Sequence, residues 1–263
     1  MAHLLSVTRK GPPPRETFPF SIPAVRSLER LDLGVPVTFF VGENGSGKST
    51  VLEALACAAE LPAMGGEPVS RDASLAGQRD LAKNLRLAWS VRSRKGFFLR
   101  AEDFFGYLKS EARTDARIAR EEAERLGIEP PAIPSEDGHL HVDESRAAPY
   151  LARHDARSHG ESFMDLFAER IGPGGLYLLD EPEAPLSPQR QLAFLALLAR
   201  GAREGAQFVI ATHSPILLAY PKARIYSFDR APVSEVAYDD LEHVVVTRDF
   251  LNHRAIYLAK LLD

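Results

Sequence analysis

The chain has 263 residues, 45% of them apolar, which is enough to bury the core of one large domain or two small ones. Its 32 basic and 36 acidic residues give a net charge of -4, which excludes a global positive field that would recruit nucleic acid or an anionic membrane, although it permits a local basic patch. No apolar run approaches the roughly 18 residues of a membrane span, and the amino terminus lacks a signal-peptide pattern, so we expect a cytoplasmic protein without membrane insertion.

The first predicted elements are a strand and a helix on either side of a glycine loop. Residues Val37–Val41 form a short β-branched and aromatic run that breaks at Gly42. Residues Thr50–Glu60 show the helical spacing of leucine and alanine. The single cysteine, Cys57, lies in this helix, where we expect it to be packed. It cannot form an internal disulfide, which fits a reducing compartment.

The middle of the chain is expected to leave this core. Strands are predicted over Leu85–Val91 and Phe97–Leu99, and an exposed helix over Phe104–Leu126, which is rich in helix formers and charge. We assign about residues 62–160 to an inserted, mainly helical subdomain. The whole chain, 1–263, is then one domain.

Beyond Gly160 helices and strands alternate regularly. Alternation of this kind predicts an α/β fold with a mostly parallel central sheet flanked by helices on both faces. The predicted elements are helices over Ser162–Ile171 and Ser187–Glu204, and strands over Leu176–Asp180, Gln207–Thr212 and Ala223–Phe228.

Residues Gly42–Ser49 match G-x-x-x-x-G-K-[ST] between a strand and a helix, the context that confirms a phosphate-binding loop. The glycines let backbone N–H groups curl around a β-phosphate, and the helix N-terminus adds partial positive charge. Lys48 supplies a point charge for the β- and γ-phosphates, and the Ser49 hydroxyl can ligate Mg²⁺. The predicted nucleotide contacts are Asn44, Gly45, Ser46, Gly47, Lys48, Ser49 and Thr50.

Two carboxylates stand at the end of the predicted strand Leu176–Asp180. Asp180 is placed to hold Mg²⁺, directly or through water. Glu181 faces differently because side chains alternate along a strand, which suits it to act as the general base for an attacking water; capping of the next turn is the alternative. His213 follows the strand Gln207–Thr212 and, taken alone, fits an ordinary hydrogen-bonded histidine.

Five motifs occur in a fixed order along the chain. They are the phosphate loop, Ser158–Ser162, Leu178–Pro182, Ala184–Ser187 and Thr212–Ser214. In this set the chain resembles the ABC-type ATPases, a family of P-loop NTPases. Within that family it is most similar to the small stand-alone RecF- and SMC-like ATPases of bacteria, often labelled AAA-family ATPases.

The resemblance implies an ATPase that uses ATP and Mg²⁺ at a site shared by two copies in a head-to-tail homodimer. It assigns Ser158, Gly160 and Glu161 to the signature that contacts the γ-phosphate of ATP held by the other subunit. Ala184–Ser187 corresponds to the D-loop that crosses the dimer interface. His213 corresponds to the switch histidine, which contacts the γ-phosphate and holds the attacking water.

Two parts of the pattern depart from the family. His159 stands where glycine is usual, and Glu161 where transporters mostly have glutamine, a change that resembles the SMC-like branch. No glutamine is evident where the Q-loop is expected. Glu102 is the candidate there, as a metal and water ligand, and Gln78 is the weaker one; a solvated loop residue is the alternative for each.

The residue that stacks on adenine is left open by the sequence. Phe18 or Phe20 lies upstream of the phosphate loop, where transporters carry such an aromatic. The alternation of Phe18–Ile22 is equally well explained by an edge strand that faces the core.

These features predict ATP binding and hydrolysis that close and open a homodimer, as a switch for an unidentified effector protein. The alternative is an ATP-gated DNA-binding module in repair or defence, in which Arg92, Arg94 and Lys95 would contact phosphates. A transporter ATPase subunit would need a membrane partner, and a P-loop kinase of small metabolites would complete its site with a lid; both fit the motifs less well. The sequence does not identify the biological process.

Overall fold

The computed structural model describes residues 2–13, 15–64, 75–101, 104, 125 and 159–262, with the backbone alone at 159–162. The subdomain expected over about 62–160, with its helix over Phe104–Leu126, lies mostly outside these residues and stays a prediction.

A six-stranded sheet forms the centre of the molecule, in the order β5-β6-β7-β3-β8-β9. The first five strands are parallel, and β9 runs antiparallel to β8. The predicted α/β fold with a mostly parallel sheet is therefore confirmed. The strands are β3 (Val37–Val41), β5 (Gly96–Arg100), β6 (Leu176–Asp180), β7 (Gln207–Ala211), β8 (Arg224–Ser227) and β9 (Ser234–Glu235).

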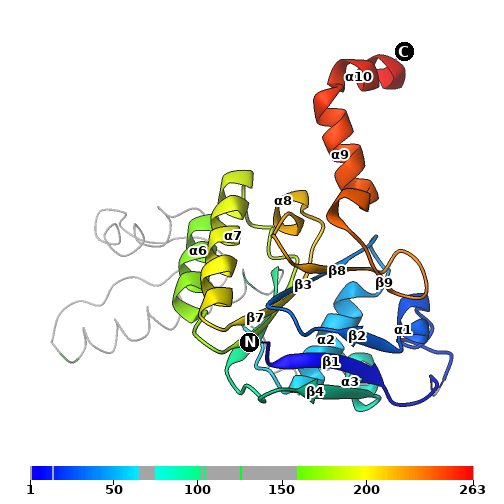
Figure 1. Cartoon of the computed structure of the whole chain (residues 1–263), viewed down its shortest axis with the longest axis vertical. Helices are drawn as coiled ribbons and strands as arrows, with labels where there is room; N and C mark the ends of the chain where they lie inside the picture. The colour runs from blue at the N-terminus through cyan, green and yellow to red at the C-terminus, as the bar shows by residue number, and fades with distance from the viewer. Residues whose placement is uncertain are drawn as a thin grey trace.

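Helices cover both faces of this sheet, as Figure 1 shows. Every residue of β3, β6 and β7 is buried, which is typical of strands covered on both sides. Along β3, Phe40 packs with α2 on one face, whereas Phe39 and Val41 pack with α6, α7 and α8 on the other, because side chains alternate along a strand. The helices are α2 (Lys48–Ala59), α3 (Ala76–Lys83), α6 (His159–Arg170), α7 (Pro188–Arg203) and α8 (Pro215–Leu218).

A second, three-stranded antiparallel sheet lies on the α2 side, in the order β2-β1-β4. Its strands are β1 (Leu4–Arg9), β2 (Arg30–Asp32) and β4 (Leu85–Trp89), and α1 (Pro23–Ser27) precedes β2. Three elements fall within the span assigned to the insertion but belong to the core: β5 is a strand of the main sheet, β4 is a strand of the second sheet, and α3 contacts α2.

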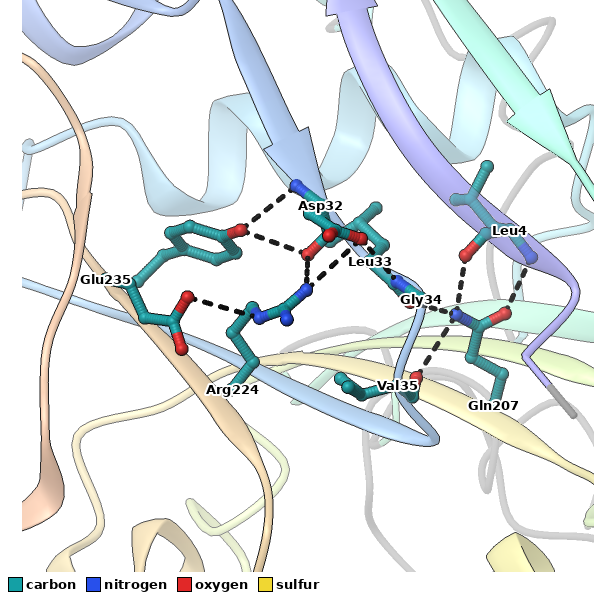
Figure 2. A network of polar contacts seen from close by, with 9 residues as sticks. Leu4, Asp32, Leu33, Gly34, Val35, Gln207, Arg224 and Glu235 are labelled. Atoms are coloured by element: carbon teal, nitrogen blue, oxygen red, sulfur yellow. Dashed lines mark hydrogen bonds and ion pairs between the residues drawn. The ribbon is translucent and has the colours of Figure 1, made fainter.

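The buried amide of Gln207, at the start of β7, joins the two sheets (Figure 2). Its Oε1 accepts hydrogen bonds from the N–H groups of His3 and Leu4, at 2.9 and 2.8 Å. Its Nε2 donates to the carbonyls of Leu4, Leu33 and Val35, at 2.9, 2.6 and 3.3 Å. One side chain thereby pairs backbone groups from the β1 strand and from the connection between β2 and β3.

The edge strand proposed over Phe18–Ile22 is wrong, because this segment forms turns. The N–H groups of Phe20 and Ser21 both donate to the carbonyl of Thr17. Prolines at 19 and 23 lack the N–H that a sheet ladder needs, which explains the local bonding. Phe20 is buried in the core, and Phe18 is half exposed.

The C-terminal helices α9 (Glu242–Asn252) and α10 (Arg254–Leu262) rise away from the body in Figure 1, beyond a short 3-10 turn at Tyr238–Asp240. Val244 is the only buried residue of α9, and α10 has none. Asp249 holds the corner between them, because its carboxylate contacts His253 at 2.8 Å and accepts from Tyr257 at 2.6 Å. Within the described ranges, no helix has the length and apolar character that crossing a membrane requires.

Cys57 is half-buried on α2, and burial raises the pKa of its thiol from 9.0 to about 11. The thiolate fraction at pH 8 should therefore be about 100-fold lower than at an unperturbed site, since each pKa unit is tenfold. We expect native protein to react slowly with a disulfide reagent at pH 8, and the same protein in denaturant to react rapidly. Equal rates in both states would contradict the packed reading.

Candidate functional site

The loop Gly42–Ser49 connects β3 to α2, and two positions in it require glycine. Gly47, the N-cap of α2, has φ of 103°, and a Cβ there would lie 2.9 Å from Ile22 Cγ2. Gly42 has φ of 145°, and a Cβ there would lie 2.9 Å from Ser46 Oγ. Both conformations are open to glycine and strained for other residues. The buried Ser46 hydroxyl has no hydrogen-bond partner among the described residues.

Lys48 is the first residue of α2 and is only 4% exposed. Its Nζ donates to the carbonyls of Gly42 at 2.6 Å and Glu43 at 3.0 Å, so the ammonium group is folded over the loop. Burial lowers the pKa of Lys48, while the nearby carboxylates of Glu181 and Asp180 act in the opposite direction. The arrangement holds a positive charge at the loop, which suits a phosphate ligand.

Ser49 and Asp180 meet across the loop and the end of β6. The Ser49 hydroxyl lies 3.2 Å from Asp180 Oδ1. Burial raises the pKa of Asp180 to about 7, against the lowering effect of the Ser49 hydrogen bond. No group of three or more His, Cys, Asp or Glu side chains that could hold a metal occurs in the part of the chain that is described. Since Mg²⁺ usually takes only one or two protein oxygens beside phosphate and water, this pair fits such an ion.

Glu181 and His213 face each other beside this pair. Glu181 follows β6 directly and has φ of 49°, and its side chain is 48% exposed. His213 follows β7, and its Nε2 lies 3.8 Å from Glu181 Oε1. With Glu43 and Asn44 they line an open pocket of about 510 Å³. The two halves of the site, separated by more than a hundred residues of sequence, are therefore adjacent in the fold.

Several predicted residues lie outside the described part of the chain or are only partly described. Ser158 and Glu102 are not described, so their assignments stay predictions. Gly160 and Glu161 lie in the first turn of α6, with the backbone alone described.

Gln78, the weaker Q-loop candidate, is not a solvated loop residue. It is 8% exposed on α3, and its Nε2 donates to Glu53 Oε2 on α2 at 2.7 Å. Glu53 also pairs with Arg100, at 2.6 Å. The amide of Gln78 thus takes part in the contact between α2 and α3.

Sequence reasoning missed Asp229, Glu183 and the hydrogen bond that the Thr212 hydroxyl donates to Glu183. Asp229 Oδ1 accepts the N–H of Glu43 in the phosphate loop at 2.7 Å. Because Asp229 follows β8, its position at the carboxyl edge of a parallel strand was a usable signal. Glu183 Oε1 accepts from the Thr212 hydroxyl at 2.6 Å, and burial raises the pKa of this carboxyl. No local pattern links Glu183 to Thr212.

The basic turn Arg92–Lys95 lies away from the site. It precedes β5, which is parallel to β6, whereas Asp180 and Glu181 stand at the carboxyl end of β6. The turn is therefore at the amino ends of the parallel strands, opposite the carboxyl ends where Asp180 and Glu181 lie. Arg92 is also paired with Glu60, at 2.7 Å.

Two family models match the chain. One, described as "AAA domain", matches residues 20–72, which hold the phosphate loop. The other, described as "AAA domain, putative AbiEii toxin, Type IV TA system", matches residues 162–219, which hold Asp180, Glu181 and His213. Both segments that carry the site therefore match models of AAA domains. A comparison of the chain with curated proteins finds no match.

Solved structures similar to this chain include two heads of SMC proteins and one component of an ABC transporter complex. The SMC head domain from Thermotoga maritima has a TM-score of 0.39 and 15% identity, over 89% of this chain and 98% of that chain. The Smc head domain from Pyrococcus furiosus was solved with an extended coiled coil and bound to the C-terminal domain of ScpA. It has a TM-score of 0.44 and 12% identity, over 97% of this chain and 100% of that chain. CbiO1 from Clostridium perfringens, part of the ABC transporter complex cbiONQ, has a TM-score of 0.39 and 17% identity, over 98% of this chain and 100% of that chain.

Proposed function

We propose that this chain hydrolyses ATP at a site that a second copy completes, so that ATP closes a head-to-tail dimer and hydrolysis opens it. The observation that carries the proposal is the half-exposed pair of Glu181 and His213. Their side chains are 48% and 41% exposed, at the mouth of an open pocket. Efficient hydrolysis needs a site that excludes bulk water. A second copy, with its signature turn at the start of α6, would provide that cover.

The chain's own groups have distinct roles in this reaction. The loop N–H groups and Lys48 bind the β- and γ-phosphates. Glu181 accepts a proton from water as the water oxygen attacks the γ-phosphorus and the bond to the bridging oxygen breaks, giving ADP and phosphate. His213, 3.8 Å from Glu181, is placed to orient that water and the γ-phosphate.

Ser49 and Asp180 are the residues that would hold Mg²⁺. The ion would neutralise charge on the phosphate oxygens. Asp180 is 9% exposed, and a cation beside it would favour the charged carboxylate that burial disfavours. Glu102 is a further candidate ligand by resemblance alone.

The test is ATP turnover and sedimentation of the wild type beside Glu181→Gln. The wild type should release phosphate, and the variant should do so at least about 100-fold more slowly, the usual contribution of a general base. The variant should keep its ATP affinity and sediment as a dimer with ATP and Mg²⁺, but as a monomer with ADP.

Two outcomes would oppose the proposal. Normal turnover in Glu181→Gln would remove Glu181 from the reaction. A variant that binds ATP but stays monomeric would remove the shared site. If DNA instead stimulated turnover with a steep salt dependence, the DNA-binding alternative would take its place.

A further inference from the structure

Glu183 is a buried carboxylate between the two catalytic loops, and the motifs assign it no role. It lies two residues after Glu181, in the turn that leaves β6. Its Oε1 accepts two hydrogen bonds from the loop after β7: the Thr212 hydroxyl at 2.6 Å and the His213 N–H at 2.8 Å. One carboxylate oxygen therefore fixes the backbone on which the His213 side chain stands.

The contact is one link of a closed ring of hydrogen bonds. Thr212 Oγ1 accepts the N–H of Ser214 at 3.0 Å, and the Ser214 hydroxyl lies 2.6 Å from Gln191 Oε1 on α7. Gln191 Nε2 donates to the Leu186 carbonyl at 3.1 Å, which returns the ring to the turn that began at Glu183. The ring thus ties the turn after β6 to the loop after β7 at two points, Glu183 and Leu186.

We infer that Glu183 is a positioning residue for ATP hydrolysis, holding the switch loop so that His213 stays against Glu181. The inference rests on the proposed function and adds a residue to its machinery. His213 Nε2 and Glu181 Oε1 are 3.8 Å apart, a separation that small loop movements would change. Misplacement of a reacting group by about 1 Å can cost on the order of 100-fold in rate.

The ring also gives the interface turn a physical route to the switch loop. Ala184–Ser187, the segment that the resemblance places at the dimer interface, begins directly after Glu183 and contains Leu186, the second point of attachment. A second copy that displaces this turn would move Glu183 and Leu186, and through them Thr212 and Ser214. Closure of the dimer would in this way set the position of His213.

The test is a double-mutant cycle on kcat. Glu183→Ala should lower kcat about 10- to 100-fold, the usual loss for a group that orients a catalytic residue, with ATP affinity changed less than about threefold. Glu183→Gln keeps an Oε1 acceptor for both donors and should stay within about threefold of the wild type. In a His213→Ala background, Glu183→Ala should cost less than about threefold more, because its effect passes through His213.

Thr212 probes the same contact from the other side and serves if Glu183→Ala does not fold. Thr212→Val removes the hydroxyl and should lower kcat as Glu183→Ala does, while Thr212→Ser keeps the hydroxyl and should not. Wild-type kcat in Glu183→Ala or Thr212→Val, or equal losses with and without His213, would overturn the inference. If Glu181→Gln is inactive while Glu183→Ala is normal, only the role of Glu183 fails; if Glu181→Gln is normal, the proposed function itself fails.

Discussion

Gln207→Leu should be among the most destabilising single substitutions in this chain, lowering the free energy of unfolding by about 3–5 kcal/mol. Leucine has a similar size, so the loss comes from hydrogen bonds and not from a cavity. The change removes the hydrogen bonds that the amide makes with the N–H and the carbonyl of the fully buried Leu4 (Figure 2). It also removes one of the two hydrogen bonds that the buried Leu33 carbonyl accepts, and leaves the one from the Val35 N–H. Each unpaired buried group costs roughly 1–3 kcal/mol. Denaturant unfolding followed by circular dichroism measures the effect.

Gln189→Leu is the matched control, since it makes the same chemical change at an exposed position on α7. It should shift the free energy of unfolding by less than about 0.5 kcal/mol. If Gln207→Leu also stays within about 1 kcal/mol of the wild type, the β1 strand is held to the main sheet by its apolar packing, and the amide network contributes little.

The parallel strands of the main sheet were predictable because their signals are local, whereas the short antiparallel β9 was missed. Val37–Val41 and Leu176–Asp180 are short apolar runs that end at a glycine and at an acidic pair, and their observed bounds match those runs. The strands β1 and β2 were missed because a short strand in an antiparallel sheet depends on partners far along the chain. The turn at Phe18–Ile22 shows the same limit, because an alternating pattern does not reveal which N–H groups find local acceptors.

The residues of the site also fall into those that local sequence predicts and those that it does not. Lys48, Asp180 and His213 could be located because each belongs to a contiguous motif at the end of a strand. The hydrogen bonds of Glu183 to Thr212 and of Asp229 to Glu43 join residues 29 and 186 positions apart, and no periodicity encodes them. The orientation of Glu181 was expected from strand alternation, whereas its φ of 49° shows that the strand has ended and the backbone turns there.

Lys48→Met should abolish function while leaving the fold stable. The Lys48 ammonium group is folded over the phosphate loop. Its removal takes away the charge that would meet the β- and γ-phosphates. We expect kcat/KM for ATP to fall at least about 10³-fold, or roughly 4 kcal/mol of transition-state stabilisation. The rise in melting temperature that ATP and Mg²⁺ give the wild type should disappear in the variant, because a ligand stabilises only the state that it binds.

Stability without ligand should hardly change, because two effects oppose each other. Lys48 is 4% exposed, and an apolar side chain of similar length removes the cost of burying its charge. The carbonyls of Gly42 and Glu43 lose the hydrogen bonds from Lys48, and Glu43 keeps only the one from the Ser46 N–H, a loss that costs about as much. Lys260→Met, at an exposed position on α10, is the matched control and should keep both turnover and the thermal shift. A Lys48→Met protein that still binds and hydrolyses ATP would show that the phosphates are held by the loop N–H groups alone.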